Sequence, residues 1–201
     1  MTTSAQPSKS DRTRQRILRA AAKAFRQQGY TSSSLREIAD SAGMQAGSLY
    51  YHFGSKEELA ECVMDMGLAG ARAAAEQALS AAGEDADPLT RIGAAFSGHL
   101  GYLVEEADFA VATLRMLHQT PDGVRTRHMR KQRVLGRFYG ELFEAARVAG
   151  QIRPQFDLSA LRMLLLGALN WTPEWYSDAG LSPEQLAAQL TDMMGRGVRP
   201  Q

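Results

Sequence analysis

The sequence predicts an all-α protein of about nine helices, in which a small N-terminal three-helix domain precedes a larger helical bundle. Two observations predict this fold class. No segment of useful length alternates apolar and polar residues with the period of two that a half-buried strand requires. Instead, glycines at helix ends and capping residues at helix starts recur along the chain. We expect an N-terminal arm over 1–10, the three-helix domain over 11–55 and the bundle over 56–201.

Capping signals set the first two helices. Apolar residues recur on one face of the first helix from Ile17 to Phe25, and Gly29 follows as its C-cap residue. Ser34 and Glu37 stand three residues apart, which is the spacing of a capping box. This pair predicts the start of the second helix.

Similar signals set the later helices. Ser55 and Glu58 predict another capping box, at the start of a helix over 56–82 that ends before Gly83. Asp87 is followed by proline, which favours the first position of a helix. The remaining helices are expected over 88–106, 108–118, 122–149, 158–172 and 183–195.

Charge is distributed unevenly along a chain whose net charge is only +1. Residues 1–56 carry a net charge of +6, and the rest of the chain carries −5. A basic N-terminal end suits contact with a polyanion, although an ordinary solvated helix surface explains the same residues. Five of these basic residues form a stripe at helical spacing, namely Arg12, Arg16, Arg19, Lys23 and Arg26.

The sequence does not indicate a secreted or membrane-spanning protein. The single cysteine, Cys62, excludes an intramolecular disulfide and suits a reducing compartment. No apolar run approaches the roughly 18–20 residues that span a bilayer, and the N-terminus has no apolar region typical of a signal peptide. We therefore expect a cytoplasmic protein.

The segment from Ser34 to Leu59 has the order of parts of a helix-turn-helix, the motif that places one helix in the DNA major groove. Ala39 is the small residue required where the two helices touch. Gly43 allows a turn with positive φ, and Leu49 faces inward from the second helix. The motif therefore predicts binding to duplex DNA.

The same residues carry a family resemblance. The run RILRAAAKAFRQQGY, which begins at Arg16, and the run SSLREIADSAGMQAGSLYYHFGSKEEL, which begins at Ser33, are similar to the TetR family of bacterial transcriptional regulators. The resemblance covers about residues 13 to 60. It implies a two-fold dimer on a palindromic operator, with a C-terminal domain over 56–201 that binds a ligand and dimerises.

Roles in DNA binding follow from the motif and from the resemblance. Side chains at the start of the second helix of the motif reach base edges, where Ala46 offers only a methyl group. The resemblance adds phosphate contacts by Ser33 and by Lys56 at the start of the fourth helix. For Tyr51 a position in the core stays open as an alternative, and Phe53 is expected in the core. The DNA-binding candidates are Ser33, Gln45, Ala46, Ser48, Tyr50, Tyr51, His52 and Lys56.

The segment GALNWTPEWY, residues 167–176, singles out a candidate ligand site. Trp171 and Trp175 stand four apart, and Pro173 between them is expected to kink or end the helix. Two interpretations remain open: two aromatic residues that anchor a helix end, or the mouth of a ligand pocket. The segment resembles one in TetR-type regulators of fatty-acid, steroid or aromatic-acid catabolism, whose effectors are acyl-CoA thioesters. The ligand-binding candidates are Phe96, Tyr102, Arg115, Met116, His118, Asn170, Trp171 and Trp175.

Two further sets of residues complete the expectations for the bundle. Basic residues around the start of the 122–149 helix are candidates for a CoA phosphate, or they form a solvated face; they are Arg115, His118, Arg125 and Arg127. The resemblance implies that the last two helices form a four-helix dimer interface. The residues expected there are Leu158, Leu161, Leu165, Leu186, Leu190, Met193 and Met194.

The sequence thus predicts a repressor that an effector releases from its operator. An enzyme is disfavoured, because no HExxH motif, Gly-rich phosphate loop or nucleophile elbow is present. We expect no cofactor and no metal. A DNA-binding activator, or an architectural protein without a ligand, remains the alternative.

Overall fold

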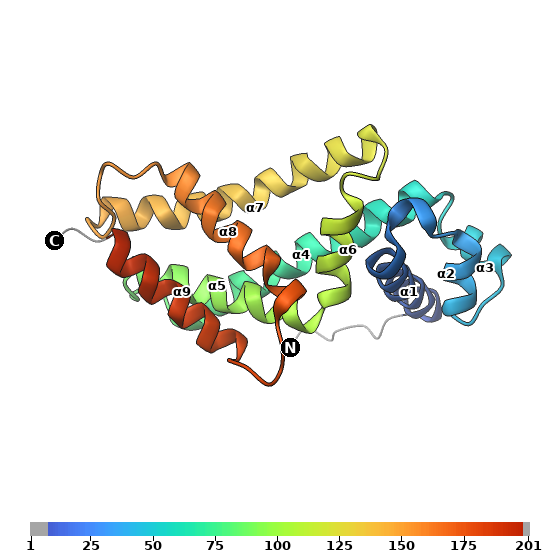
Figure 1. Cartoon of the computed structure of the whole chain (residues 1–201), viewed down its shortest axis with the longest axis horizontal. Coiled ribbons are helices and arrows are strands. Elements are labelled where there is room, and N and C mark those ends of the chain that lie inside the picture. The colour runs from blue at the N-terminus through green and yellow to red at the C-terminus, as the bar shows by residue number, and fades with distance from the viewer. Residues whose placement is uncertain (1–7, 199–201) are drawn as a thin grey trace.

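The computed structural model describes residues 8–198 and is helical throughout, with no strand in that range, which confirms the predicted all-α class. The molecule is elongated, with a head of three helices at one end and the body behind it (Figure 1). The head comprises residues 8–55 and the body comprises residues 56–198. The helices of the head are α1 (Lys9–Ser32), α2 (Leu35–Ser41) and α3 (Ala46–His52).

The helices of the body surround one hydrophobic core. Helix α4 runs from the head into the body, where it packs along α5, while α8 crosses between α7 and α9 (Figure 1). No helix within residues 8–198 is both long and apolar enough to cross a membrane. The helices of the body are α4 (Lys56–Ala82), α5 (Pro88–Glu105), α6 (Ala107–Met116), α7 (Asp122–Val148), α8 (Leu158–Trp175) and α9 (Pro183–Val198).

Helix α1 begins earlier than the sequence indicates. Ser8 caps it and exchanges hydrogen bonds with Asp11, so the helix starts at Lys9, inside the arm predicted over 1–10. The rest of that arm lies outside the described residues. Gly29 was expected to end this helix as its C-cap residue. It breaks the helical geometry there, with a φ of +78° that only glycine adopts at little cost, but α1 continues beyond it to Ser32.

The two predicted capping boxes differ in detail. Ser34 and Glu37 form a complete one, in which each side chain accepts from the other residue's backbone N–H. At the start of α4, the Ser55 hydroxyl accepts from the backbone N–H of Glu58, but the Glu58 carboxylate accepts from Gly54 instead of Ser55. The Glu58 carboxylate thus binds the N–H of the residue before the N-cap, and not that of the N-cap itself as in a complete capping box.

Pro173 does not end α8, so the boundary predicted at residue 172 is wrong. The helix continues to Trp175. Proline removes one backbone donor, the one that would pair with the Leu169 carbonyl. In the same turn, the Thr172 hydroxyl donates to the Ala168 carbonyl at 3.2 Å, and only two more residues follow before the helix ends.

Two hydrophobic cores divide the molecule, and α4 and α6 contribute to the one in the head. Met64 of α4 lies in the core of the head, whereas Ala75, three turns later, lies in the core of the body. Phe109 and Met116 of α6 are also buried in the core of the head. The core of the head therefore extends beyond residue 55, where the sequence predicts the domain boundary, and includes residues of α4 and α6.

Candidate DNA-binding site and ligand cavity

The turn between α2 and α3 has the geometry that the helix-turn-helix requires. Gly43 has a φ of +66°, and the backbone N–H of Met44 donates to the Ala39 carbonyl at 3.0 Å. Ala39 and Leu49 are both fully buried, as predicted. Gln45 then caps α3 with its backbone extended, which directs the chain into the recognition helix.

The outer face of α3 gathers the predicted DNA-reading side chains at the end of the molecule farthest from the body (Figure 1). Gln45 and Ser48 are exposed, and Ala46 is half-buried. Tyr51 is 86% exposed, so the alternative that placed it in the core is wrong. Its ring packs nearly at right angles to the His52 ring, with 5.3 Å between the centroids.

Ser33 and Lys56 are engaged within the head. The Ser33 hydroxyl is buried and donates to the Tyr30 carbonyl at 3.1 Å, so its one proton is not available to a phosphate, contrary to the sequence expectation. The Lys56 ammonium donates to the carbonyls of Thr31 and Ser33 and lies 4.5 Å from the centroid of the Tyr30 ring. Burial lowers the pKa of Lys56 and raises the pKa of Tyr30 to about 12. Lys56 therefore joins α4 to the end of α1.

The basic stripe of α1 is partly neutralised by two acidic residues at the start of α6, namely its N-cap Glu106 and Asp108 in its first turn. Arg19 forms two hydrogen bonds with the Glu106 carboxylate, at 2.8 and 2.9 Å, and Arg26 pairs with Asp108 at 2.9 Å. The Arg115 guanidinium also donates to the Arg26 carbonyl at 2.9 Å. Part of the stripe thus binds the head to the body, which sequence spacing alone does not reveal.

An inner cavity of about 70 Å³ lies in the body between α4, α5, α6, α7 and α8. Apolar side chains form most of its wall, and a few polar ones interrupt them. His99 and His128 are both buried, and burial lowers the pKa of each, that of His99 to about 4. The lining residues are Gly67, Leu68, Ala71, His99, Leu103, Ala110, Thr113, Leu114, His128, Gln132, Leu135 and Asn170.

The inner cavity adjoins a larger groove of about 610 Å³ between α7 and α8, and five residues line both. The shared residues are His99, Leu114, Gln132, Leu135 and Asn170. Three guanidinium groups line the groove, those of Arg133, Arg137 and Arg162, and no carboxylate of the described residues does. An apolar interior with a cationic entrance suits an amphipathic anion.

Comparison with known proteins identifies the fold and the family. The model of the bacterial regulatory proteins of the tetR family matches residues 17–63, and that of the tetracyclin repressor-like C-terminal domain matches residues 85–198. The chain belongs to the TetR family. It is therefore a DNA-binding transcriptional regulator and not an enzyme.

Individual relatives extend over nearly the whole chain. The transcriptional repressor KstR2 of Mycolicibacterium smegmatis is 27% identical over 195 residues, which are 96% of this chain and 93% of KstR2. The regulator PfmR of Thermus thermophilus has a TM-score of 0.79 at 28% identity, over 92% of this chain and 100% of PfmR. AibR, solved with isovaleryl coenzyme A and operator DNA, has a TM-score of 0.73 at 27% identity, over 94% of this chain and 98% of AibR.

In this TetR-family chain, some of the predicted ligand residues line the groove and the others do not. Asn170 and Trp171 line the groove. Phe96 packs on Tyr139 in the core of the body, and Met116 is buried in the core of the head, so neither lines the cavity or the groove. Sequence reasoning missed His99, because its apolar neighbours on α5 are typical of a helix packed in a core.

The other predicted ligand residues lie elsewhere. The Tyr102 hydroxyl donates to the Met66 carbonyl at 3.1 Å, which joins α5 to α4. Arg115 binds Glu174 as well as α1. His118 and Trp175 are exposed and line neither the cavity nor the groove.

The other residues expected to bind a CoA phosphate are engaged too. Arg125 pairs with Asp122, and Arg127 pairs with Glu61. These ion pairs lie outside the groove, and the cationic groups at its entrance come instead from the middle of α7 and from α8.

The residues expected at the dimer interface mostly face the chain's own core. Met194 is buried, whereas Met193 is 69% exposed. The other five, Leu158, Leu161, Leu165, Leu186 and Leu190, pack against the core of the body. The cause is that α8 is apolar on all sides, so periodicity does not distinguish its inner face from its outer one.

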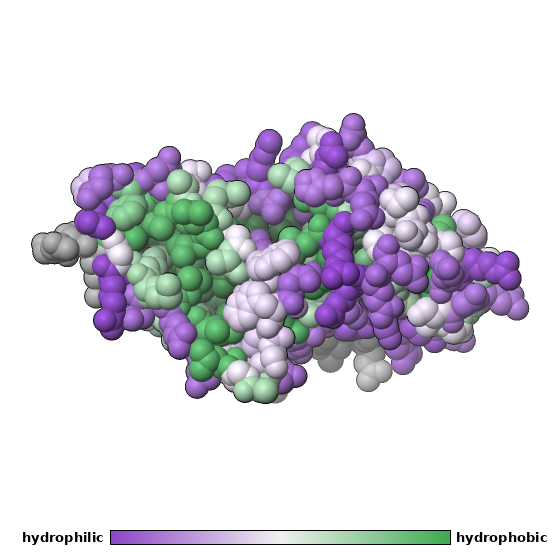
Figure 2. Space-filling model, viewed as in Figure 1, coloured by the Kyte–Doolittle hydropathy of each residue, from purple (hydrophilic) through white to green (hydrophobic). Residues whose placement is uncertain are grey.

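The outer face of α8 carries the exposed apolar residues instead. Leu164 is 75% exposed, and Met163, Trp171 and Trp175 are more than half exposed. Figure 2 shows a broad hydrophobic patch over the end of the body where α8 and α9 lie, while the head is mostly hydrophilic. We name the four residues Met163, Leu164, Trp171 and Trp175 the α8 stripe.

Proposed function

We propose that this regulator is a repressor that binds a palindromic operator as a dimer and is released by an acyl-CoA thioester. One observation carries the proposal. The inner cavity is lined by residues of α4 and α6, the same two helices that contribute buried side chains to the core of the head. A ligand in the cavity therefore touches the elements that position the DNA-reading helix.

For DNA reading, we propose that Gln45 and Ser48 contact base edges while Tyr50, Tyr51 and His52 lie against the backbone. These side chains are exposed or half-buried on α3. Gln45→Ala should change which base is preferred at one position of each half-site. Tyr51→Ala should weaken binding about equally for all sequences. Selection from random DNA with the two variants distinguishes these roles, and an unchanged preference for Gln45→Ala would contradict its role.

For dimerisation, we propose that the α8 stripe packs against its copy in the second subunit. Four large apolar side chains on one helix face are more than an isolated subunit ordinarily exposes. A two-fold dimer presents two α3 helices to half-sites about 34–36 Å apart, or a multiple of that spacing.

For the effector, the groove supplies the chemistry that an acyl-CoA requires. Neither Arg133 nor Arg137 has an ion-pair partner among residues 8–198, and both line the entrance. Phosphate groups bind guanidinium forks well, and the apolar cavity behind them accepts an acyl chain. The related AibR was solved with isovaleryl coenzyme A and operator DNA.

The effect of a bound ligand can reach the head along two helices, α4 and α6. Gly67, Leu68 and Ala71 of α4 line the cavity one to two turns after Met64, which lies in the core of the head. Helix α6 lines the cavity with Thr113 and is tied to α1 by its ion pairs. An acyl chain that displaces either helix changes the separation of the two heads. The ligand must bind the displaced arrangement more tightly than the operator-bound one.

Titration calorimetry with a panel of acyl-CoA thioesters tests the effector class. The double variant Arg133→Ala/Arg137→Ala should bind acyl-CoA at least about tenfold more weakly, since two charge-assisted contacts are lost. The matched control is Arg130→Ala, which removes an exposed arginine of α7 that does not line the groove. Equal losses in both variants would show nonspecific attraction, and no binding by the wild type would contradict the proposed effector.

A further inference from the structure

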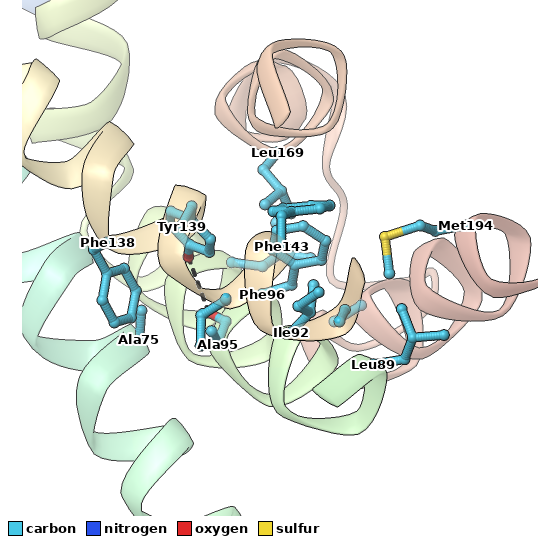
Figure 3. Close-up of a cluster of buried hydrophobic side chains, with 14 of the residues drawn as sticks. Ala75, Leu89, Ile92, Ala95, Phe96, Phe138, Tyr139, Phe143, Leu169 and Met194 are labelled. Atoms are coloured by element: carbon cyan, nitrogen blue, oxygen red, sulfur yellow. Dashed lines mark hydrogen bonds between the residues drawn. The ribbon is translucent and has the colours of Figure 1, made fainter. Parts of the chain in front are cut away.

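The closed end of the ligand site contains a histidine with a fixed hydrogen-bonding pattern. His99 is 1% exposed and lines both the inner cavity and the groove. Its Nδ1 lies 3.0 Å from the Tyr139 hydroxyl oxygen. That hydroxyl lies 3.2 Å from the carbonyl oxygen of Ala95, the contact drawn as a dashed line in Figure 3.

The two contacts of Tyr139 determine which ring nitrogen of His99 carries the proton. A carbonyl oxygen only accepts, so the single hydroxyl proton of Tyr139 is donated to Ala95. The hydroxyl oxygen then accepts from His99, and Nδ1 must carry the hydrogen. If Nδ1 accepted instead, the Tyr139 oxygen would face the Ala95 oxygen with no proton between them. Nε2 is therefore an unprotonated acceptor.

The neutral state of His99 is maintained by its surroundings. Burial lowers its pKa to about 4, so the ring is uncharged at neutral pH. Nε2 forms no hydrogen bond within residues 8–198, and it is not among the fully enclosed polar atoms that lack a partner, so it is accessible from the cavity that the ring lines. A ligand in the cavity can therefore supply the donor that this acceptor lacks.

Two amide side chains stand in the same site. Gln132 of α7 and Asn170 of α8 both line the cavity and the groove, and neither side chain forms a hydrogen bond with another described residue. Each amide offers two N–H donors and an acceptor oxygen. The remainder of the inner wall is mainly apolar, with leucines from four helices, namely Leu68, Leu103, Leu114 and Leu135.

We propose that the effector carries a hydroxyl group at its buried end, which donates to His99 Nε2 and accepts from the amide of Asn170 or Gln132. This inference rests on the effector site proposed above and names the chemical class of the group that occupies its closed end. A hydroxyl is the smallest common neutral group that both donates and accepts, which suits an end of the site lined mainly by leucines. A ketone, a carboxylate or an alkyl end has no proton to donate to Nε2.

A set of three ring compounds tests the inference without coenzyme A. Cyclohexanol, cyclohexanone and methylcyclohexane are similar in size, but only the alcohol donates. Ligand-observed NMR titration of the full chain should give a dissociation constant for cyclohexanol about tenfold lower than for the other two, since a site built for a hydroxyl discriminates against its absence. Equal or tighter binding of cyclohexanone, or no saturable binding of cyclohexanol, would overturn the inference.

Variants of the site sharpen this test. His99→Phe removes the acceptor, and the double variant Gln132→Ala/Asn170→Ala removes both amides of the site. Each should lower the preference for the alcohol over methylcyclohexane to within about threefold. The matched control Gln77→Ala removes an exposed amide of α4 outside the cavity and should retain the full preference. Gln132 and Asn170 are only half-buried, so the double variant provides a test should His99→Phe fail to fold. A full preference in either folded variant would contradict the inference.

Pairs of acyl-CoA thioesters with and without a terminal hydroxyl separate this inference from the proposed function. If acyl-CoAs bind and release the operator but neither panel shows a preference for the hydroxyl, the function stands and the inference fails. If cyclohexanol is preferred but no acyl-CoA binds, the effector class is wrong and the hydroxyl site stands. We expect the hydroxylated member of each pair to bind about tenfold more tightly.

Discussion

The head and the body are packed to different degrees, although both are made of helices of ordinary length. In the head, the turn glycine, the capping box of α2 and the carbonyls bound by Lys56 leave few polar groups unsatisfied. The body instead contains a cavity and a groove, and its buried polar atoms without partners include Asp65 Oδ1 and His128 Nδ1.

The difference indicates separate tasks for the two regions. A reading head has to keep its side chains in one arrangement, and a fully packed core does that. A body that responds to a ligand has to retain unfilled volume and unsatisfied polar groups that the ligand completes. The two regions meet along α4 and α6. In the proposed mechanism, a ligand that fills the body displaces the packed head as a unit through these two helices.

The largest expected effect comes from truncating one leucine to alanine in each of the two regions. Leu49→Ala removes a fully buried side chain from the core of the head and should lower the free energy of unfolding by about 3 kcal/mol. Leu114→Ala enlarges a cavity that already exists, and because Leu114 is half-buried it should cost about 1 kcal/mol. Urea denaturation of both variants measures the difference. Equal losses would show that the two regions are equally well packed.

The pH dependence of stability tests the buried polar groups of the body. His99 has an ordinary pKa of 6.5 that burial lowers to about 4 in the folded protein. The unfolded state binds the proton more readily, so this contribution is complete above about pH 6.5 and is lost as the pH falls toward 4. It amounts to at most about 3 kcal/mol, and His128 adds a contribution of the same sign.

Unfolding in urea between pH 4 and 7 measures this slope. His99→Phe should reduce the slope, whereas His118→Gln, at an exposed position, should leave it unchanged. A slope that is identical in wild type and His99→Phe would contradict the buried neutral state of His99.

The α8 stripe allows a test of the body's outer face. Leu164→Glu places a charge at the centre of the proposed interface and should weaken the dimer by about 2 kcal/mol or more. The isolated subunit should remain folded, because Leu164 is 75% exposed. Sedimentation at several concentrations measures dimerisation, and Val148→Glu, at an exposed apolar position at the end of α7, is the control that should leave the dimer unchanged. A dimer of unchanged stability in Leu164→Glu would place the interface elsewhere.

The smallest expected effect concerns the ion pair between the two regions. Glu106→Gln removes the charge that holds Arg19, and an exposed pair of this kind contributes below about 1 kcal/mol. Its effect on effector-induced release should exceed its effect on stability, because α6 joins the cavity to α1. Anisotropy titrations with and without effector measure release, and equal responses in variant and wild type would exclude this pair from signal transfer.

The turns and helix starts that depend on neighbouring residues were predictable from the sequence. Gly43, Gly83 and the Ser34 box set turns and helix starts through the conformation of a few neighbouring residues, and the structure confirms them. Helix α4 was predicted with both boundaries correct, over 56–82. The residues proposed to read DNA from Gln45 to His52 lie together for the same reason, since they belong to one short helix and its N-cap.

Contacts between distant segments were not predictable in this way. The hydroxyl of Ser33 and the ammonium of Lys56 are engaged by carbonyls that the fold brings to them. The cavity combines residues from five helices, and His99 acquires its role from Tyr139, forty residues later in the chain. The outer face of α8 was missed because leucines occupy both of its faces.

In the proposed mechanism, a ligand that fills the body releases the head from DNA. Fluorescence anisotropy tests it most directly, with the wild-type protein and an operator selected from random DNA by the protein itself. We predict that a saturating acyl-CoA weakens operator binding at least about tenfold, a coupling of the usual size for such switches, and that Arg133→Ala/Arg137→Ala binds the operator normally but does not respond. Operator affinity that stays the same while calorimetry shows the acyl-CoA bound would contradict the account.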